Sequence, residues 1–280
     1  MYDPREAARD AREGRPGRQD ARASRLPSRE LERLHDARRP ALERDTMLTP
    51  AQQRILSDIG AFRLAREEDL GKRTDLRRLA DRGFTTVRPS RMGERYVALT
   101  KLGARHLRIA RPTRSQAIHV GFPQRRGDRG LKHDAAVYRA CRAETSRQES
   151  GTRLTRISLD IDLRADILKD VARTERELKR PLEPHELELI AQRYQVAVDQ
   201  ESRIHYPDAQ LEFEREDGSR YAVGVEVTTD DYRSAAIGAK RDAGFSMYHL
   251  PSSPGAGVPS RVEGTGRAPV RIEEYELWAL

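Results

Sequence analysis

Two carboxylates in the second half of the chain, Asp208 and Glu226, have the residue types and the spacing that metal-assisted chemistry needs. Asp208 begins a strand-like stretch within the run HYPDAQLEFERE, and Glu226 lies 18 residues later, in the run RYAVGVEVTT. The dipeptide Asp217-Gly218 separates the two runs and is a strong hairpin signal, so we expect neighbouring strands. Carboxylates on adjacent strands can hold a hard cation such as Mg²⁺. That ion would activate water and stabilise charge on a scissile phosphate.

Two basic residues are candidates to complete this site. Two carboxylates held close together repel, and the pKa of one rises unless a cation intervenes. We therefore predict that Asp208, Glu226 and Lys240 converge in one pocket, with His133 at its rim. The structural alternative is a turn-forming Pro-Asp at Asp208 and a buried carboxylate paired with an arginine at Glu226.

A second kind of chemistry is predicted by the distribution of charge. The chain carries 53 Lys and Arg against 45 Asp and Glu, a formal net charge of +8. Residues 47–111 alone carry 15 basic and 7 acidic side chains, so the excess lies in one short stretch. Such a local field favours a polyanionic partner, most commonly nucleic acid. The alternative is a solvated basic face, which any surface helix can show.

The elements expected in residues 47–111 would position these cations. Thr49-Pro50 predicts the start of a first helix, LAREEDL a short second one, and Thr74 the N-cap of a third, TDLRRLADRG. The strand-like runs FTTVRP and RYVALT follow, and then the helix KLGARHLRIA. This order is that of a winged helix-turn-helix, whose third helix enters the major groove. The candidate DNA contacts on the third helix and hairpin are Lys72, Arg73, Arg77, Arg78, Arg82, Arg88, Arg91 and Arg95.

The rest of the chain predicts a second domain and two connecting segments. Residues 131–150 have a helical period, and RLTRISLDIDLR alternates as a strand does. A helical insertion over about 164–200 precedes the hairpin, which a helix (DYRSAAIGAKRDAG) and a core strand (GFSMYHL) follow. We therefore expect an α/β (α+β) protein with a disordered or partly helical tail over 1–46. The rest of the chain is expected to form a winged helix over 47–111, a linker over 112–130 and a second domain over 131–280.

Without its insertion, the αβββαβ order of this second domain resembles the PD-(D/E)xK nuclease-like superfamily. The resemblance implies a restriction-endonuclease-like fold with Asp208 and Glu226 as metal ligands and catalytic residues. The lysine of that motif is replaced by Thr228. Lys240, on the following helix, is then the candidate for a migrated lysine, and His133 for a further catalytic group. The replacement favours a protein without nuclease activity.

The whole chain resembles the replication-relaxation family more closely. The resemblance covers residues 48–250 and rests on LTPAQQRIL, a histidine on a helix, PDA, a Val-Glu-Val strand and the run TTDDYRSAAIGAKRDAGFSMY. It implies a DNA-binding accessory protein in the replication, relaxation or conjugative mobilisation of a plasmid or mobile element. It also implies double-stranded DNA as partner, together with a relaxase or other transfer protein.

Two other functions stay open at this stage. One is an active Mg²⁺-dependent endonuclease, and the other is a transcriptional regulator whose second domain only dimerises. No apolar run approaches the ~18 residues of a membrane span, and no apolar signal segment opens the chain. A single cysteine excludes an intrachain disulfide framework, so we expect a cytoplasmic protein.

Overall fold

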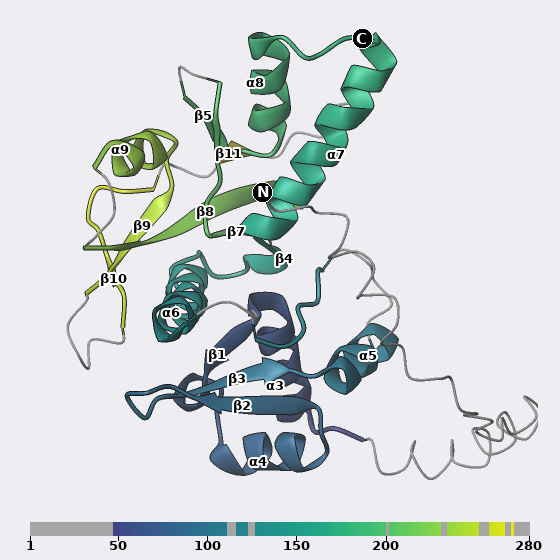
Figure 1. Cartoon of the computed structure of the whole chain (residues 1–280), viewed down its shortest axis with the longest axis vertical. Helices are drawn as coiled ribbons and strands as arrows, with labels where there is room; N and C mark the ends of the chain where they lie inside the picture. Colours follow the sequence, from purple (N-terminus) through teal and green to yellow (C-terminus); the bar gives the residue numbers. More distant parts are fainter. Residues whose placement is uncertain are drawn as a thin grey trace, which may run out of the picture. The chain divides into compact units, whose positions relative to one another are not determined.

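The computed structural model of the 280-residue chain describes seven stretches, namely residues 47–110, 116–122, 127–199, 202–230, 234–251, 258–266 and 270–271. The predicted mixed α/β class is confirmed, because helices accompany two main sheets (Figure 1). Thr49–Leu280 groups as one compact unit. The tail predicted over 1–46 lies outside the described residues. Within the described part, no helix is both long and apolar enough to cross a bilayer.

The first helix begins where the sequence predicts it. The Thr49 hydroxyl accepts a hydrogen bond from the Gln52 amide, and the Gln52 side chain accepts one from the Thr49 amide, both at 3.2 Å. This capping box satisfies two donors that the first turn leaves without helical partners. The elements up to residue 110 are α3 (Pro50–Phe62), β1 (Leu64–Arg66), the 3-10 turn η1 (Glu67–Asp69), α4 (Arg73–Asp81), β2 (Thr85–Pro89), β3 (Arg95–Leu99) and α5 (Lys101–Ala110).

The helix predicted over LAREEDL is wrong. Leu64–Arg66 forms strand β1 instead, antiparallel to β3 with Leu64 opposite Ala98, and all three of its residues are buried. Sheet pairing and burial outweigh the helix propensity of this short segment. The resulting small sheet has the order β1-β3-β2. The sheet consists of the predicted β2–β3 hairpin and of β1, a strand that the sequence does not predict.

The third predicted helix is present as α4 but starts earlier than expected. Its N-cap is Lys72, so the prediction of Thr74 as N-cap is wrong. Leu76 and Leu79 are buried on its inner side. Gly83 then takes a φ of +73°, a left-handed conformation in which glycine lacks the strain of other residues.

A larger sheet occupies the second half of the chain, in the order β10-β9-β8-β7-β4, with β11 pairing with β8. Strands β4, β7 and β8 run antiparallel, whereas β9 is parallel to β8. Parallel neighbours need a crossover connection, and α9 lies in it. The helices and strands of this half, apart from those between β4 and β7, are α6 (Asp128–Thr145), β4 (Arg153–Leu159), β7 (Ala209–Glu214), β8 (Arg220–Thr229), α9 (Ser234–Asp242), β9 (Ser246–Leu250), β10 (Ser260–Arg261) and β11 (Val270–Arg271).

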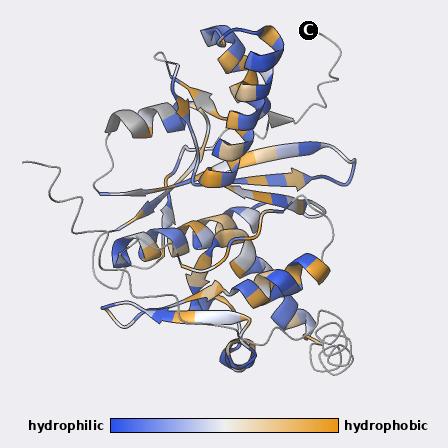
Figure 2. Cartoon of the chain, turned by 45° about the vertical axis from the view of Figure 1, so that its right-hand side comes forward, coloured by the Kyte–Doolittle hydropathy of each residue, from blue (hydrophilic) through white to orange (hydrophobic). Residues whose placement is uncertain are grey.

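The predicted insertion separates β4 from β7. It consists of α7 (Asp160–Leu178), α8 (Pro184–Arg193), β5 (Ala197–Val198) and β6 (Ile204–His205). The strand predicted through RLTRISLDIDLR stops at Leu159, because the Asp162 side chain accepts the Leu159 amide at 3.0 Å and starts α7. Hydrophobic and hydrophilic residues mix along α7, on which Ile161 and Leu168 are exposed (Figure 2).

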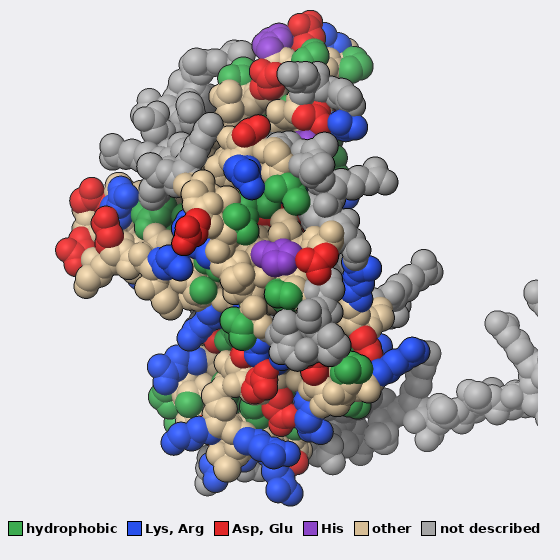
Figure 3. Space-filling view, turned by 90° about the vertical axis from the view of Figure 1, so that its left-hand side faces the viewer, with side chains coloured by type: hydrophobic (Ala, Val, Ile, Leu, Met, Phe, Trp, Pro, Cys, Tyr) green, Lys and Arg blue, Asp and Glu red, His purple; other side chains and the backbone are tan. Residues whose placement is uncertain are grey.

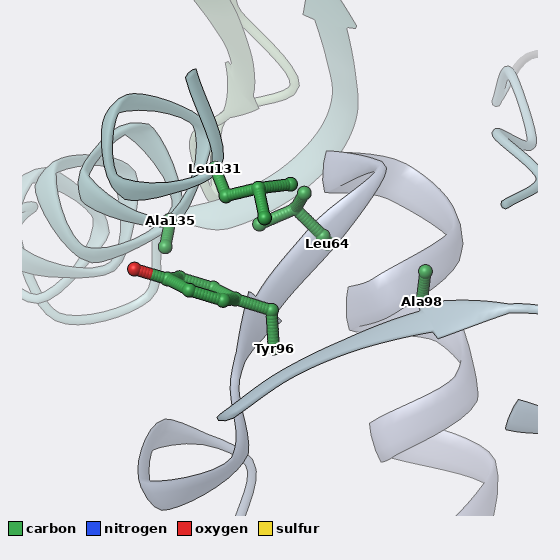
Figure 4. Packing of buried hydrophobic residues seen from close by; sticks show 5 residues of the cluster. All are labelled: Leu64, Tyr96, Ala98, Leu131 and Ala135. Atoms are coloured by element: carbon green, nitrogen blue, oxygen red, sulfur yellow. The ribbon is translucent and has the colours of Figure 1, made fainter. Parts of the chain in front are cut away.

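Helix α6 lies between the two sheets (Figure 1). It begins at Asp128, inside the segment predicted as linker. Five buried residues form the contact, Leu131 and Ala135 from α6 with Leu64, Tyr96 and Ala98 from the small sheet (Figure 4). Two polar contacts add to it, Arg139 Nε with Asp69 at 2.7 Å and the Tyr138 hydroxyl with Asp58 at 3.3 Å. The basic part of the chain and the carboxylate-bearing sheet therefore share one helix.

Candidate functional site

The two predicted carboxylates lie side by side at the end of the β7–β8 pair. The last paired residues are Ala209 and Val225, so Asp208 and Glu226 occupy the next position of the register. Each carboxylate binds the other's strand. The Asp208 amide donates to Glu226 Oε2 at 3.1 Å, and the Val227 amide donates to Asp208 Oδ2 at 2.8 Å. The hairpin geometry alone thus brings the acidic pair together.

Lys240 joins this pair from α9. Its Nζ lies 2.5 Å from Glu226 Oε1, and the Glu226 side chain is completely buried while Lys240 is 11% exposed. A buried charge is costly unless it is paired and hydrogen-bonded. Lys240 therefore supplies the counter-charge of Glu226, and these two residues meet as the sequence analysis expects.

His133 approaches Asp208 from α6. Its Nε2 lies 3.4 Å from Asp208 Oδ2, and its Nδ1 lies 3.6 Å from Asp134 Oδ1. Burial opposes a charged imidazole, but hydrogen bonding and charge from Asp134 and Asp208 raise the pKa of His133 to about 10. The pKa of Asp208 is lowered despite its burial, because His133, the Val227 amide and Lys240 stabilise its charged form. His133 is therefore a cation at neutral pH.

Thr228, two residues after Glu226, supplies no positive charge to the site. The Thr228 side chain is buried, and its hydroxyl donates to the Tyr248 carbonyl oxygen of β9 at 3.3 Å. Thr228 follows Glu226 by two residues, so both side chains leave the same face of β8. A hydroxyl bonded to a neighbouring strand ties the sheet together and supplies no positive charge.

The four predicted residues form two ion pairs. Two carboxylates face two cations, Glu226 with Lys240 and Asp208 with His133. Within the described stretches no group of three His, Cys, Asp or Glu side chains is placed to hold a metal ion. A divalent cation would compete with Lys240 and His133 for oxygens that they already contact. The four side chains, paired in this way, do not fit a resident metal ion. The binding of Mg²⁺ at this site stays a prediction.

Known proteins offer no guide to this site. No family model, curated protein or solved structure matches the chain.

The predicted DNA contacts gather on α4 and the β2–β3 hairpin. We call these eight residues the basic surface: Lys72, Arg73, Arg77, Arg78, Arg82, Arg88, Arg91 and Arg95. All are exposed except Arg82 and Arg88, which are half-buried. Lys and Arg side chains gather at the lower end of the molecule in Figure 3, where Figure 1 places α4 and the hairpin.

Few carboxylates oppose the basic surface. Glu67 forms an ion pair with Arg95 and lies 3.9 Å from Arg73, so one acid serves two of the cations. Among the described residues, no ion pair engages Arg77 or Arg78, which are both exposed on α4. The charges of these two arginines are therefore not compensated by an ion pair within the described residues.

Asp134 is the member of the site that sequence reasoning missed. Its side chain is buried, and it contributes to the raised pKa of His133. The signal was the charged dipeptide His133-Asp134 on a helix whose other face is apolar. A charged residue next to a candidate histidine is a common surface pattern, so its burial required the structure.

Proposed function

We propose that this protein binds double-stranded DNA through the basic surface, as an accessory protein in the replication, relaxation or mobilisation of a plasmid or mobile element. The observation that carries the DNA-binding part is the exposed set of arginines on α4 and the hairpin, with Glu67 as their one ion-paired acid among the described residues. Duplex DNA carries a dense array of negatively charged phosphates, and an exposed set of arginines is complementary to it in charge.

The order of elements supports a specific mode of binding. Helix α4 is followed by a two-stranded hairpin and then by α5, as in winged helices. In that mode α4 would enter the major groove, and Arg88, Arg91 and Arg95 would follow the phosphates. Strand β1 and the 3-10 turn η1 take the place of the expected second helix, and α4 and the hairpin are still present.

Replacing Arg77 and Arg78 together tests the proposal. Both are exposed, so Arg77→Ala/Arg78→Ala should keep the fold and weaken duplex binding by about tenfold or more. Fluorescence anisotropy with a labelled duplex measures the affinity. The matched control is Arg173→Ala/Arg176→Ala on α7, a pair of exposed arginines outside the basic surface. Equal affinity of both double variants and the unaltered protein would contradict the proposal.

The carboxylate site supports a role without cleavage. The strand order and the places of Asp208 and Glu226 are consistent with the nuclease-like resemblance. Lys240 and His133, however, neutralise both carboxylates in the protein itself. We therefore assign the larger sheet to assembly on DNA or on a transfer protein such as a relaxase, rather than to hydrolysis.

Incubation with supercoiled plasmid and Mg²⁺ or Mn²⁺ separates this assignment from an active endonuclease. We expect no nicking above background. Nicking that is lost in Asp208→Ala would establish the endonuclease, whereas nicking that persists in Asp208→Ala would indicate a contaminant.

A further inference from the structure

A groove of about 680 Å³ lies beside the basic surface, between the tip of the β2–β3 hairpin, the start of α6 and the ends of β8 and β9. Ser90 and Met92 line it from the hairpin, Lys132 and His133 from α6, and Leu250 from β9. Its volume is in the range of small-ligand pockets and does not suit a whole duplex.

The groove combines an apolar wall with a cationic rim. Met92 is 73% exposed, and Pro251 and the largely buried Leu250 continue the same lining. Arg129, Lys132 and the charged His133 supply positive groups. The unpaired part of a nucleic acid needs this combination, because its bases are apolar on their faces and its backbone is anionic.

The carboxylates of the groove are engaged within the protein. Glu94 forms an ion pair with Arg66 and accepts the Tyr96 hydroxyl. Asp128 accepts the Arg91 amide at 2.8 Å, which fixes the hairpin tip against α6. Among the described lining residues, the groove therefore carries three basic side chains against two carboxylates, and Lys132 Nζ is held over it by the Pro251 carbonyl oxygen at 3.3 Å.

The groove adjoins both sites described above. The hairpin that forms one wall also carries Arg91 of the basic surface, and His133, which lines the groove, contacts Asp208. We infer that the groove binds one or two unpaired nucleotides of a strand that leaves the duplex, so that the protein recognises a junction between double- and single-stranded DNA. This inference rests on the proposed DNA binding and names its substrate class.

Paired substrates test the inference separately from duplex binding. The probes are a blunt duplex and the same duplex with a tail of two thymidines at the 3′ or the 5′ end, measured by anisotropy with the full chain. We expect one tailed duplex to bind about tenfold more tightly than the blunt one, because each accommodated base adds apolar contact with Met92 and Leu250 and its phosphate adds charge contact with Lys132. Equal binding of all three duplexes would overturn the junction while leaving the DNA-binding proposal intact. Loss of all binding would instead mark failure of the proposed function.

Two substitutions locate the effect. Met92→Asp, at an exposed position, and Lys132→Glu should abolish the preference for the tail and keep most of the affinity for the blunt duplex. The matched control is Leu168→Asp, an exposed apolar residue on α7. Arg77→Ala/Arg78→Ala should weaken tailed and blunt duplexes equally. A preference for the tail that survives in both Met92→Asp and Lys132→Glu would also overturn the inference.

Discussion

Lys240 and Glu226, 14 residues apart, form an ion pair of 2.5 Å in the interior of the protein, between α9 and β8. The contact neutralises a carboxylate that no water reaches, and it fastens α9 to the sheet. A pair in this position affects stability chiefly through what its loss leaves behind, since one buried charge without its counter-charge is costly.

Removing the cation of this pair should therefore destabilise the protein strongly. Lys240→Met is expected to lower the free energy of unfolding by about 3–5 kcal/mol, measured by urea denaturation. The control Lys169→Met breaks an exposed pair with Asp166 and should change it by about 1 kcal/mol or less. The double variant Lys240→Met/Glu226→Leu should regain much of the loss. A double variant as unstable as Lys240→Met would show that the two charges do not act as a pair.

The stability of the protein should fall as the solution becomes alkaline. The folded-state pKa of His133 is about 10, above the ~6.5 of an unfolded chain. The charged imidazole thus contributes fully below pH 6.5, and its contribution is lost as the pH rises from 6.5 through 10. In urea denaturation at pH 6, 8 and 10, the unaltered protein should lose stability across this window. His133→Gln should flatten that part of the profile, and an unchanged slope would argue against a charged His133.

Asp208 should act in the opposite direction at low pH. Its folded pKa is depressed below the ordinary 3.8, so its contribution is present above that value. The contribution is lost as the pH falls from 3.8 through the folded pKa. Asp208→Asn should reduce the acid-induced loss of stability in this range. An acid limb identical to that of the unaltered protein would exclude an ionised, stabilising Asp208.

The shared helix α6 should make the two halves unfold together. Leu131 is fully buried between α6 and the small sheet, and Leu131→Ala is expected to cost about 2–5 kcal/mol. Hydrogen exchange should show this loss equally for the amides of β3 and of β8. Loss of protection in β3 alone would mean that the halves are independent folding units.

Binding to duplex DNA should depend steeply on salt. Each neutralised phosphate releases condensed counterions, so the logarithm of the binding constant falls linearly with the logarithm of the salt concentration. Arg77→Ala/Arg78→Ala should reduce that slope by about two, one for each arginine. Anisotropy titrations between 50 and 200 mM salt, roughly the range over which the effect is large, measure it. An identical slope would place both arginines away from the phosphates.

Local sequence signals predicted the elements that depend on local interactions. The Thr49-Pro50 helix start and the Asp217-Gly218 hairpin follow from capping and turn chemistry, and both are present. The hairpin also made the meeting of Asp208 and Glu226 predictable, because it fixes their register. Strand β1 was not predictable, since its pairing partner β3 lies some 30 residues later in the chain.

The sequence predicts His133 at the rim of the pocket, but long-range packing decides which group it contacts. The approach of His133 to Asp208 depends on how α6 packs on β8, which no spacing in the sequence encodes. The burial of Asp134 has the same origin. Helix α7 was missed at its start because Asp160 and Asp162 continue the alternation of β4 until a side-chain cap ends it.

The reciprocal bonds of Asp208 and Glu226 have a consequence for how acidic motifs are interpreted. Each carboxylate accepts the backbone amide that the other strand presents just beyond the last paired residues. The two side chains thereby continue the hydrogen bonding between β7 and β8 by one further position. The backbone contacts of such a pair therefore account for its presence in a hairpin without any catalytic role.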